Sequence, residues 1–419
     1  MNAADASPFL ARSLRGIWPM LRKYSPAAAR AAVVKHIGKI GVEARAALGI
    51  VTGSMPRLAP SLAVLCCGLL SSCVSLPPAP PAAETLAKME RVAEWQLANP
   101  AKHPRDGWVQ GAGYTGMMAL AEISRSPRFH DAMMTMGAGN QWKPAARIYH
   151  ADDHCVAQTY LALYAQHHDP AMIAPIAERF DYILAHPKDD NLEFTGTWKN
   201  DRWAWCDSLY MAPPAWARLA ALTGKTAYLD YMVDHWWKTS AYLYDKDEHL
   251  YYRDSTYFGK KEANGQKVFW SRGNGWVLGG LVRVLENLPA NHPARPRFEQ
   301  QFREMAARVV ALQQPDGFWH SSLLDPASFP AKEASGTGFF CYGLLWGVNH
   351  GLLDRREYLP VALKAWDALT ACVQPDGKLI HVQPIGADPK KFDENSTEPY
   401  GVGAFLLAGC EVYRLSGGK

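Results

Sequence analysis

The chain has 419 residues, 48% of them hydrophobic, and a formal net charge of +4. This length suffices for one large domain or two ordinary ones. The charge is uneven, because residues 1–54 carry a net charge of +6 and the remainder therefore carries −2. Phosphate binding needs a clustered basic surface, so this nearly neutral body argues against a nucleic acid as the ligand.

The N-terminal region has the pattern of an export signal. Residues 62–70 are apolar but too few to span a membrane, and they end in Leu70-Ser71-Ser72-Cys73. A short apolar core closed by small residues is typical of a signal peptide, and Leu-Ser-Ser-Cys resembles a bacterial lipobox. An ordinary buried helix is the alternative. We expect a bacterial lipoprotein, periplasmic or anchored in the outer membrane through a lipid on Cys73.

These features divide the chain into four parts. Residues 1–54 are predicted to be a disordered or spurious basic extension, because Met55 is a better start for the signal peptide over 55–73. A Pro-rich tether over 74–84 follows, and a catalytic domain occupies 85–419. Its five cysteines are odd in number and have no paired spacing, which predicts buried thiols and neither a disulfide framework nor a zinc motif.

The body has a helical period and a loose repeat. Leu278, Leu281, Val282 and Leu285 occupy one helix face. An early unit lies around residues 111–121, and five later helix-opening segments lie 54, 66, 63 and 65 residues apart, near Asp153, Asp207, Gly273, Gly336 and Gly401. Six helical hairpins predict an all-α (α/α)6 barrel. An open solenoid is the alternative, although its repeats are usually shorter, roughly 34–47 residues. The best candidate for a strand is 250–253.

Polar and aromatic residues recur where the inner helices are expected to begin. Each carboxylate among them could simply cap a helix. Their recurrence at one end of a ring favours a site instead, and the fifteen Trp of the chain suit stacking on sugar rings. The residues are Asp152, Asp153 and His154; Trp203, Trp205 and Asp207; Trp270, Arg272, Asn274 and Trp276; Glu333 and Ser335; Glu398 and Tyr400.

Asp207 is the strongest candidate for chemistry. Trp203, Trp205 and Leu209 surround it in sequence and should desolvate it. Desolvation raises the pKa of a carboxyl group, so that it can act as a general acid. Asp152 or Asp153 would supply a second carboxylate, whose negative charge would raise that pKa further.

Cationic and aromatic residues nearby suit a carbohydrate ligand. The fork of Arg272 matches the two oxygens of a substrate carboxylate. Trp205, Trp270 and Trp276 could form a stacking surface. His150 and His154 lie four residues apart, but no acidic residue of the metalloprotease type stands between them, so no metal is expected.

Two segments carry a family resemblance. Residues 207–214, Asp-Ser-Leu-Tyr-Met-Ala-Pro-Pro, and 269–276, Phe-Trp-Ser-Arg-Gly-Asn-Gly-Trp, resemble signature segments of the unsaturated rhamnogalacturonyl hydrolases. That family, glycoside hydrolase family 105, is related to the unsaturated glucuronyl hydrolases of family 88. The similarity covers roughly residues 85–416. It implies an (α/α)6 barrel without metal or cofactor, acting on oligosaccharides that end in a 4,5-unsaturated uronic acid.

The resemblance also implies a reaction and its residues. The reaction is hydration of the double bond, in which Asp207 protonates C4 and then assists the attack of water at C5. Asp153, or Asp152 one residue earlier, corresponds to the second Asp of the family. Arg272 and Trp276 correspond to its substrate-binding Arg and Trp.

The remaining expected substrate contacts are Asp152, Trp205, Trp270, His154 and Arg253. Arg253 stands where many members carry a His associated with substrate contacts, which is a departure from the family pattern. A conventional inverting glycosidase and a sugar-binding lipoprotein without turnover are the alternative functions.

Overall fold

The computed structural model describes residues 76–188, 191–196 and 202–418. The predicted extension, the signal peptide and Cys73 lie outside these residues. No helix in the described part of the chain is long and apolar enough to cross a membrane. The α-helices are α5 (Ala82–Ala98), α6 (Trp108–Ile123), α7 (Arg128–Gly139), α8 (Ala157–His167), α9 (Ala174–Ala185), α10 (Ser208–Met211), α11 (Pro213–Thr223), α12 (Thr226–Leu243), α13 (Ser271–Leu285), α14 (Arg295–Val310), α15 (Ala334–Asn349), α16 (Arg355–Thr370) and α17 (Pro399–Leu415).

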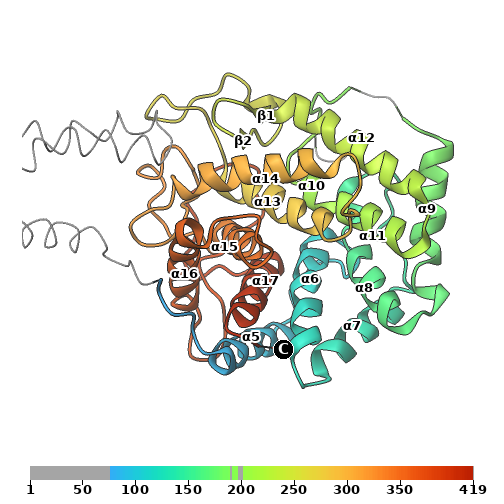
Figure 1. Cartoon of the computed structure of the whole chain (residues 1–419), viewed down its shortest axis with the longest axis horizontal. Helices are drawn as coiled ribbons and strands as arrows, with labels where there is room; N and C mark the ends of the chain where they lie inside the picture. The colour runs from blue at the N-terminus through green and yellow to red at the C-terminus, as the bar shows by residue number, and fades with distance from the viewer. Residues whose placement is uncertain (1–75, 189–190, 197–201, 419) are drawn as a thin grey trace, which may run out of the picture. The chain divides into compact units, whose positions relative to one another are not determined.

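Inner and outer helices alternate along the chain. Helices α6, α8, α11, α13, α15 and α17 each contact the next, and α17 contacts α6, so the inner ring closes. The short α10 packs between α11 and α13. Helices α5, α7, α9, α12, α14 and α16 lie outside this ring (Figure 1). The predicted (α/α)6 barrel is therefore confirmed, and its closure excludes an open solenoid.

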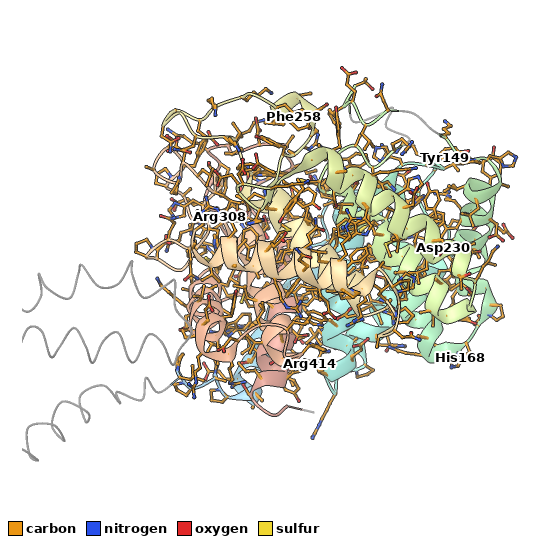
Figure 2. All side chains as sticks on the ribbon, turned by 45° about the horizontal axis from the view of Figure 1, so that its top comes forward. Tyr149, His168, Asp230, Phe258, Arg308 and Arg414 are labelled. Carbon is orange, nitrogen blue, oxygen red and sulfur yellow. The ribbon has the colours of Figure 1, made fainter. Side chains whose placement is uncertain are left out.

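Burial patterns distinguish the two rings. Every residue of the inner helix α15 except its last, Asn349, is buried, whereas the outer helix α14 buries little beyond Phe298, Phe302, Met305 and Val309 on one face. A helix that is apolar all round must be surrounded by protein, and one with a single apolar stripe lies at the surface. Side chains fill the space between the helices (Figure 2).

Strands and short 3-10 turns are confined to the connections. Strand β1 (Tyr244–Asp245) pairs antiparallel with β2 (Leu250–Tyr251), where the sequence predicted a strand. The 3-10 turns are η1 (Ala151–His154), η2 (Pro170–Met172) and η3 (Ser255–Tyr257). Cys155, Cys206, Cys341, Cys372 and Cys410 are free thiols and buried, as predicted.

Closure of the ring requires small residues where its first and last helices meet. A Cβ atom on Gly116 of α6 would lie 2.3 Å from the carbonyl oxygen of Gly403. A Cβ atom on Gly403 of α17 would lie 2.3 Å from the carbonyl oxygen of Ala112. Both obstructions are backbone atoms, which cannot rotate aside as side chains do.

We therefore expect Gly403→Ala to destabilise the protein by about 2 kcal/mol or more, because overpacking here must displace a helix. Thermal or urea unfolding measures the change. Gly139→Ala is the matched control, because Gly139 ends α7 and its added Cβ would approach nothing closer than 3.7 Å. Equal stability of Gly403→Ala and the control would contradict the close approach.

Candidate active site

A cavity of about 480 Å³ opens where the inner helices begin. Trp108 is the first residue of α6, Asp152 belongs to the turn before α8, and Asp207 immediately precedes α10. The closed ring thus gathers residues from distant parts of the chain around one space. The lining residues are Trp108, Arg147, Asp152, Trp205, Asp207, Met211, Arg253, Ile385, Gly386, Ala387 and Lys390.

Asp207 is buried in this cavity and does not cap its helix. It stands at the N-cap position of α10, yet its side chain accepts no capping hydrogen bond. Its carboxylate instead lies 3.4 Å from the thiol of Cys206 and 3.8 Å from Nε of Arg253. Burial raises the pKa of Asp207, and the positive charges of Arg253 and Arg272 oppose that rise only in part. The carboxyl group is therefore suited to hold a proton.

Asp152 is the second carboxylate in the cavity. It lies in η1, and its side chain is 18% exposed. Burial is the main cause that raises the pKa of Asp152 to about 7, and the negative charges of Asp207 and Asp153 add to the rise. Arg147 and Arg253 act in the opposite direction. The cavity thus holds two carboxyl groups whose pKa values are both raised above the ordinary value, chiefly by burial.

Asp153 faces the other way and binds Arg147. Its carboxylate accepts hydrogen bonds from Arg147 through the backbone N–H at 2.7 Å, Nε at 3.0 Å and Nη2 at 2.5 Å. Asp153 is 4% exposed and does not line the cavity, whereas Arg147 does. The structure therefore places Asp152, not the expected Asp153, beside Asp207, because the tight turn of η1 points successive side chains in different directions.

Arg253 supplies buried positive charge beside Asp207. Its Nη1 donates to Asp254 at 2.6 Å, and its guanidinium lies over the ring of Phe194 at 4.6 Å. The preceding strand is held by Asn274, whose amide accepts from the backbone N–H of Tyr251 at 2.7 Å and donates to its carbonyl at 3.1 Å. The Asn of the Arg-Gly-Asn-Gly-Trp segment thus positions Arg253.

Arg272 does not occupy the expected position of a substrate clamp. It is fully buried, with its guanidinium over the rings of Trp270 and Tyr400 at 4.4 and 4.8 Å. It donates to the carbonyl oxygens of Gln383 at 2.5 Å and Pro384 at 2.9 Å. These bonds use the fork of Arg272 to hold the loop whose next residues, 385–387, line the cavity.

Two expected aromatic contacts also lie behind the cavity wall. Trp270 is buried and donates to the side-chain oxygen of Gln383 at 2.9 Å, which fixes the same loop. Trp276 is fully buried against Trp108, Tyr210 and other rings. Trp205, by contrast, lines the cavity as expected.

His154 belongs to the core. A ring nitrogen lies 2.8 Å from the carbonyl oxygen of Ile148, and the ring packs against Phe180 and Trp216. Burial lowers the pKa of His154 to about 3, so the ring is neutral. In the part of the chain that the structure describes, no three His, Cys, Asp or Glu residues are grouped to hold a metal ion.

Sequence reasoning missed several cavity residues. Trp108 opens the first inner helix and follows the same pattern as the other candidates, so its position was a usable signal. Met211 lies in the signature segment over 207–214, whereas Arg147 and the loop residues Ile385 and Lys390 carry no comparable signal. Ile385 is 52% exposed, an unusual position for a large apolar side chain.

A closed double ring of helices holds, at one mouth, a cavity lined by two carboxylates, three cationic side chains and two tryptophans, an arrangement suited to a carbohydrate-active enzyme. Residues 82–416 match glycosyl hydrolase family 88, and the chain belongs to that family of glycoside hydrolases. This result confirms the resemblance found in the sequence.

Individual relatives cover most of the chain. An "unsaturated 3S-rhamnoglycuronyl hydrolase" of Formosa agariphila is 39% identical over 79% of this chain and 91% of its own. A protein of the same name from an Alteromonas species is 35% identical over 77% and 84%. A solved structure of a family 88 glycosyl hydrolase from Bacteroides vulgatus is 33% identical, with a TM-score of 0.74 over 80% of this chain and 99% of that one.

The raised pKa of Asp152 has a consequence for stability. Between its ordinary value of 3.8 and about 7, the folded protein keeps this proton while the unfolded chain releases it, so raising the pH across this window destabilises the fold. Asparagine cannot ionise. We therefore expect Asp152→Asn to gain stability relative to the wild type, by roughly 1 kcal/mol or more, between about pH 4 and pH 7.

Thermal unfolding of both proteins across this pH range measures that gain. Asp230→Asn is a suitable control, because Asp230 lies on α12 with its side chain exposed and without an ion pair among the described residues, and its difference from wild type should stay constant. A constant difference for Asp152→Asn as well would show that Asp152 is not desolvated.

Proposed function

We propose that the enzyme removes a 4,5-unsaturated uronic acid from the non-reducing end of oligosaccharides made by polysaccharide lyases. The observation that carries this proposal is the pairing of Asp207 and Asp152 in one cavity, both with raised pKa values, next to the cation Arg253. The names of the two relatives above support an unsaturated rhamnoglycuronyl group as the substrate.

The proposed reaction is hydration of a vinyl ether. Protonated Asp207 transfers its proton to C4, and positive charge develops at C5 and the ring oxygen. The Asp207 carboxylate then takes a proton from the water molecule that attacks C5, which restores the acid. The resulting hemiketal at C5 opens the ring and releases the neighbouring sugar from C1. One water molecule is consumed, and the protein is unchanged.

Arg253 and Asp152 have complementary roles in this scheme. The buried guanidinium of Arg253 lies 3.8 Å from the carboxylate of Asp207, and it suits the substrate carboxylate. Asp152, accessible within the cavity, suits a hydrogen bond to a sugar hydroxyl or to the attacking water. Trp205 offers a ring face to the sugar.

We expect Asp207→Asn to lower kcat by about 10² to 10⁴-fold, because the amide has no acidic proton to deliver. The loss of ultraviolet absorbance by the conjugated double bond measures turnover on lyase-treated oligosaccharides. Full activity of Asp207→Asn would exclude this mechanism. Hydrolysis of saturated oligosaccharides at an equal rate would favour the inverting glycosidase, and binding without product would favour the sugar-binding protein.

A matched pair of variants tests the choice of the second carboxylate. Asp152→Asn should impair kcat or KM directly and leave the fold intact. Asp153→Asn should act mainly through Arg147, by loosening the wall that Arg147 forms. A larger loss of kcat in Asp153→Asn than in Asp152→Asn, at equal stability, would indicate that Asp153 is the second carboxylate of the site.

We propose further that the enzyme is exported and anchored by a lipid on Cys73. Support comes from the apolar run over 62–70 and the Leu-Ser-Ser-Cys sequence that ends at Cys73. We expect Cys73→Ser to shift the protein, expressed with residues 55–419 in a Gram-negative bacterium, from the membrane fraction to the soluble or unprocessed fraction. Radiolabelled palmitate incorporation measures lipidation, and an equal label in Cys73→Ser would contradict the assignment.

A further inference from the structure

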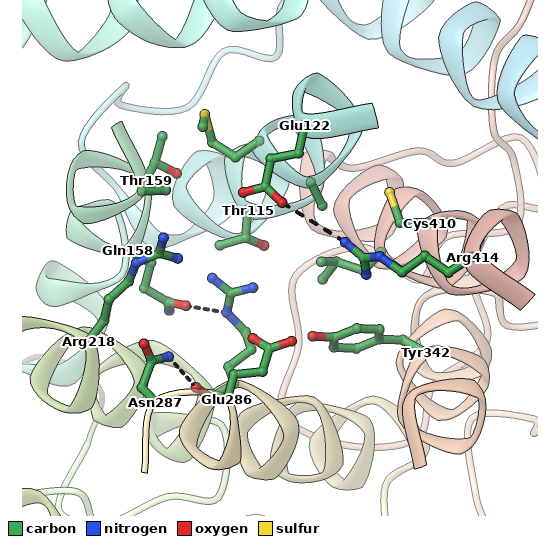
Figure 3. Close-up of a pocket in the computed structure, with 15 residues that line it drawn as sticks. Thr115, Glu122, Gln158, Thr159, Arg218, Glu286, Asn287, Tyr342, Cys410 and Arg414 are labelled. Carbon is green, nitrogen blue, oxygen red and sulfur yellow. Dashed lines mark hydrogen bonds and ion pairs between the residues drawn. The ribbon is translucent and has the colours of Figure 1, made fainter. Parts of the chain in front are cut away.

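A second cavity lies at the opposite end of the inner ring. Figure 3 shows the side chains that line it, and its volume is about 290 Å³. Glu122 near the end of α6, Arg218 in α11, Arg283 near the end of α13 and Arg414 near the end of α17 contribute to its wall. The proposed active site is instead lined by residues at the beginnings of the inner helices, so the two cavities occupy opposite mouths of the barrel.

The charges in this cavity are not all neutralised. Arg414 forms ion pairs with Glu411 and, at 4.0 Å, with Glu122. Arg283 donates from Nε to the side-chain oxygen of Gln158 at 2.6 Å, but no carboxylate of the described chain lies within ion-pair distance of it. Arg218 likewise has no hydrogen bond or ion pair among these residues. Two guanidinium groups in the wall therefore retain the capacity to bind an anion.

The surroundings show that the two arginines are near one another and partly desolvated. Burial lowers the pKa of Arg218, and the positive charge of Arg283 lowers it further. Removing two neighbouring positive charges from water is unfavourable unless an anion compensates their charge. Glu122 and Glu286 also line the cavity and oppose this lowering of the Arg218 pKa, but neither lies within ion-pair distance of Arg218 or Arg283.

The polar groups around the arginines indicate the kind of anion. The carboxylate of Glu286 and the hydroxyl of Tyr342 also border the cavity, and neither has a hydrogen-bond partner among the described residues (Figure 3). A small inorganic anion would face Glu286 and be repelled. A molecule with one carboxylate and several hydroxyl groups would use all these groups, because hydroxyls donate to Glu286 while the carboxylate meets the arginine forks.

We propose that this cavity is a second binding site, for a monosaccharide-sized hydroxy acid such as a sugar acid, with Arg218 and Arg283 holding the carboxylate. The volume suits one ring and not an oligosaccharide chain.

The site also contacts the segment that carries Asp207. Gln158, which accepts from Arg283, donates from its amide to the backbone carbonyl of Tyr210 at 2.8 Å. Tyr210 lies in α10, three residues after Asp207. A single glutamine thus joins the wall of this cavity to the segment that carries Asp207.

Titration calorimetry with D-glucuronate, and with uncharged D-glucose as the matched control, tests this site. We expect glucuronate to bind and glucose to bind at least tenfold more weakly. Arg218→Met should weaken the glucuronate affinity at least tenfold, about 1.4 kcal/mol, since methionine keeps the apolar stem but loses the fork. Arg253→Met distinguishes glucuronate binding in the two cavities. This variant alters only the proposed active site, so glucuronate should still bind in the second cavity.

The outcomes are distinct. Loss of glucuronate binding in Arg253→Met but not in Arg218→Met would place the ligand in the active-site cavity and overturn the proposal. Absence of binding to the wild type at about 50 mM would overturn it as well. If Arg218→Met does not fold, Glu286→Ala provides a second test and should weaken glucuronate binding by removing a hydroxyl acceptor. Turnover is not measured, so failure here leaves the proposed activity unaffected.

Discussion

The close contact between α6 and α17 is the constraint on which the rest of the structure depends. These helices are the first and last of the inner ring, and they meet backbone to backbone at Gly116 and Gly403. Without that contact the helices would form an open array, and their first residues would not surround a common space. Closure of the ring creates the cavity, because it brings Trp108, Asp152 and Asp207 together at one mouth.

The cavity differs from an ordinary cluster of helix caps in what its carboxylates bind. Glu333 caps α15 by accepting from the backbone N–H groups of Ser335 and Gly336. Asp207 occupies the equivalent place at α10 but accepts no such bond. A carboxylate that neither caps a helix nor forms a short ion pair retains the free energy cost of its burial, and that cost appears as a raised pKa.

Much of this arrangement could be predicted from the sequence, for identifiable reasons. Helical period and repeat spacing determine the barrel, and the tryptophans beside Asp207 indicate its desolvation. The choice between Asp152 and Asp153 could not be predicted, because it depends on the direction of each side chain in a 3-10 turn. Arg272 has the fork expected of a substrate clamp, but its partners are carbonyl groups more than a hundred residues later in the chain, which no local pattern reveals.

The reactivity of the five buried thiols can report where the protein opens. Each cysteine of the described body is enclosed, and burial raises the pKa of every one of these thiols above its ordinary value. Only the thiolate reacts readily with alkylating reagents, and only when it is accessible. Because Cys155 and Cys206 lie close in sequence to Asp152 and Asp207 while Cys410 lies on α17, their separate labelling rates would distinguish motion at one mouth from separation of the whole ring.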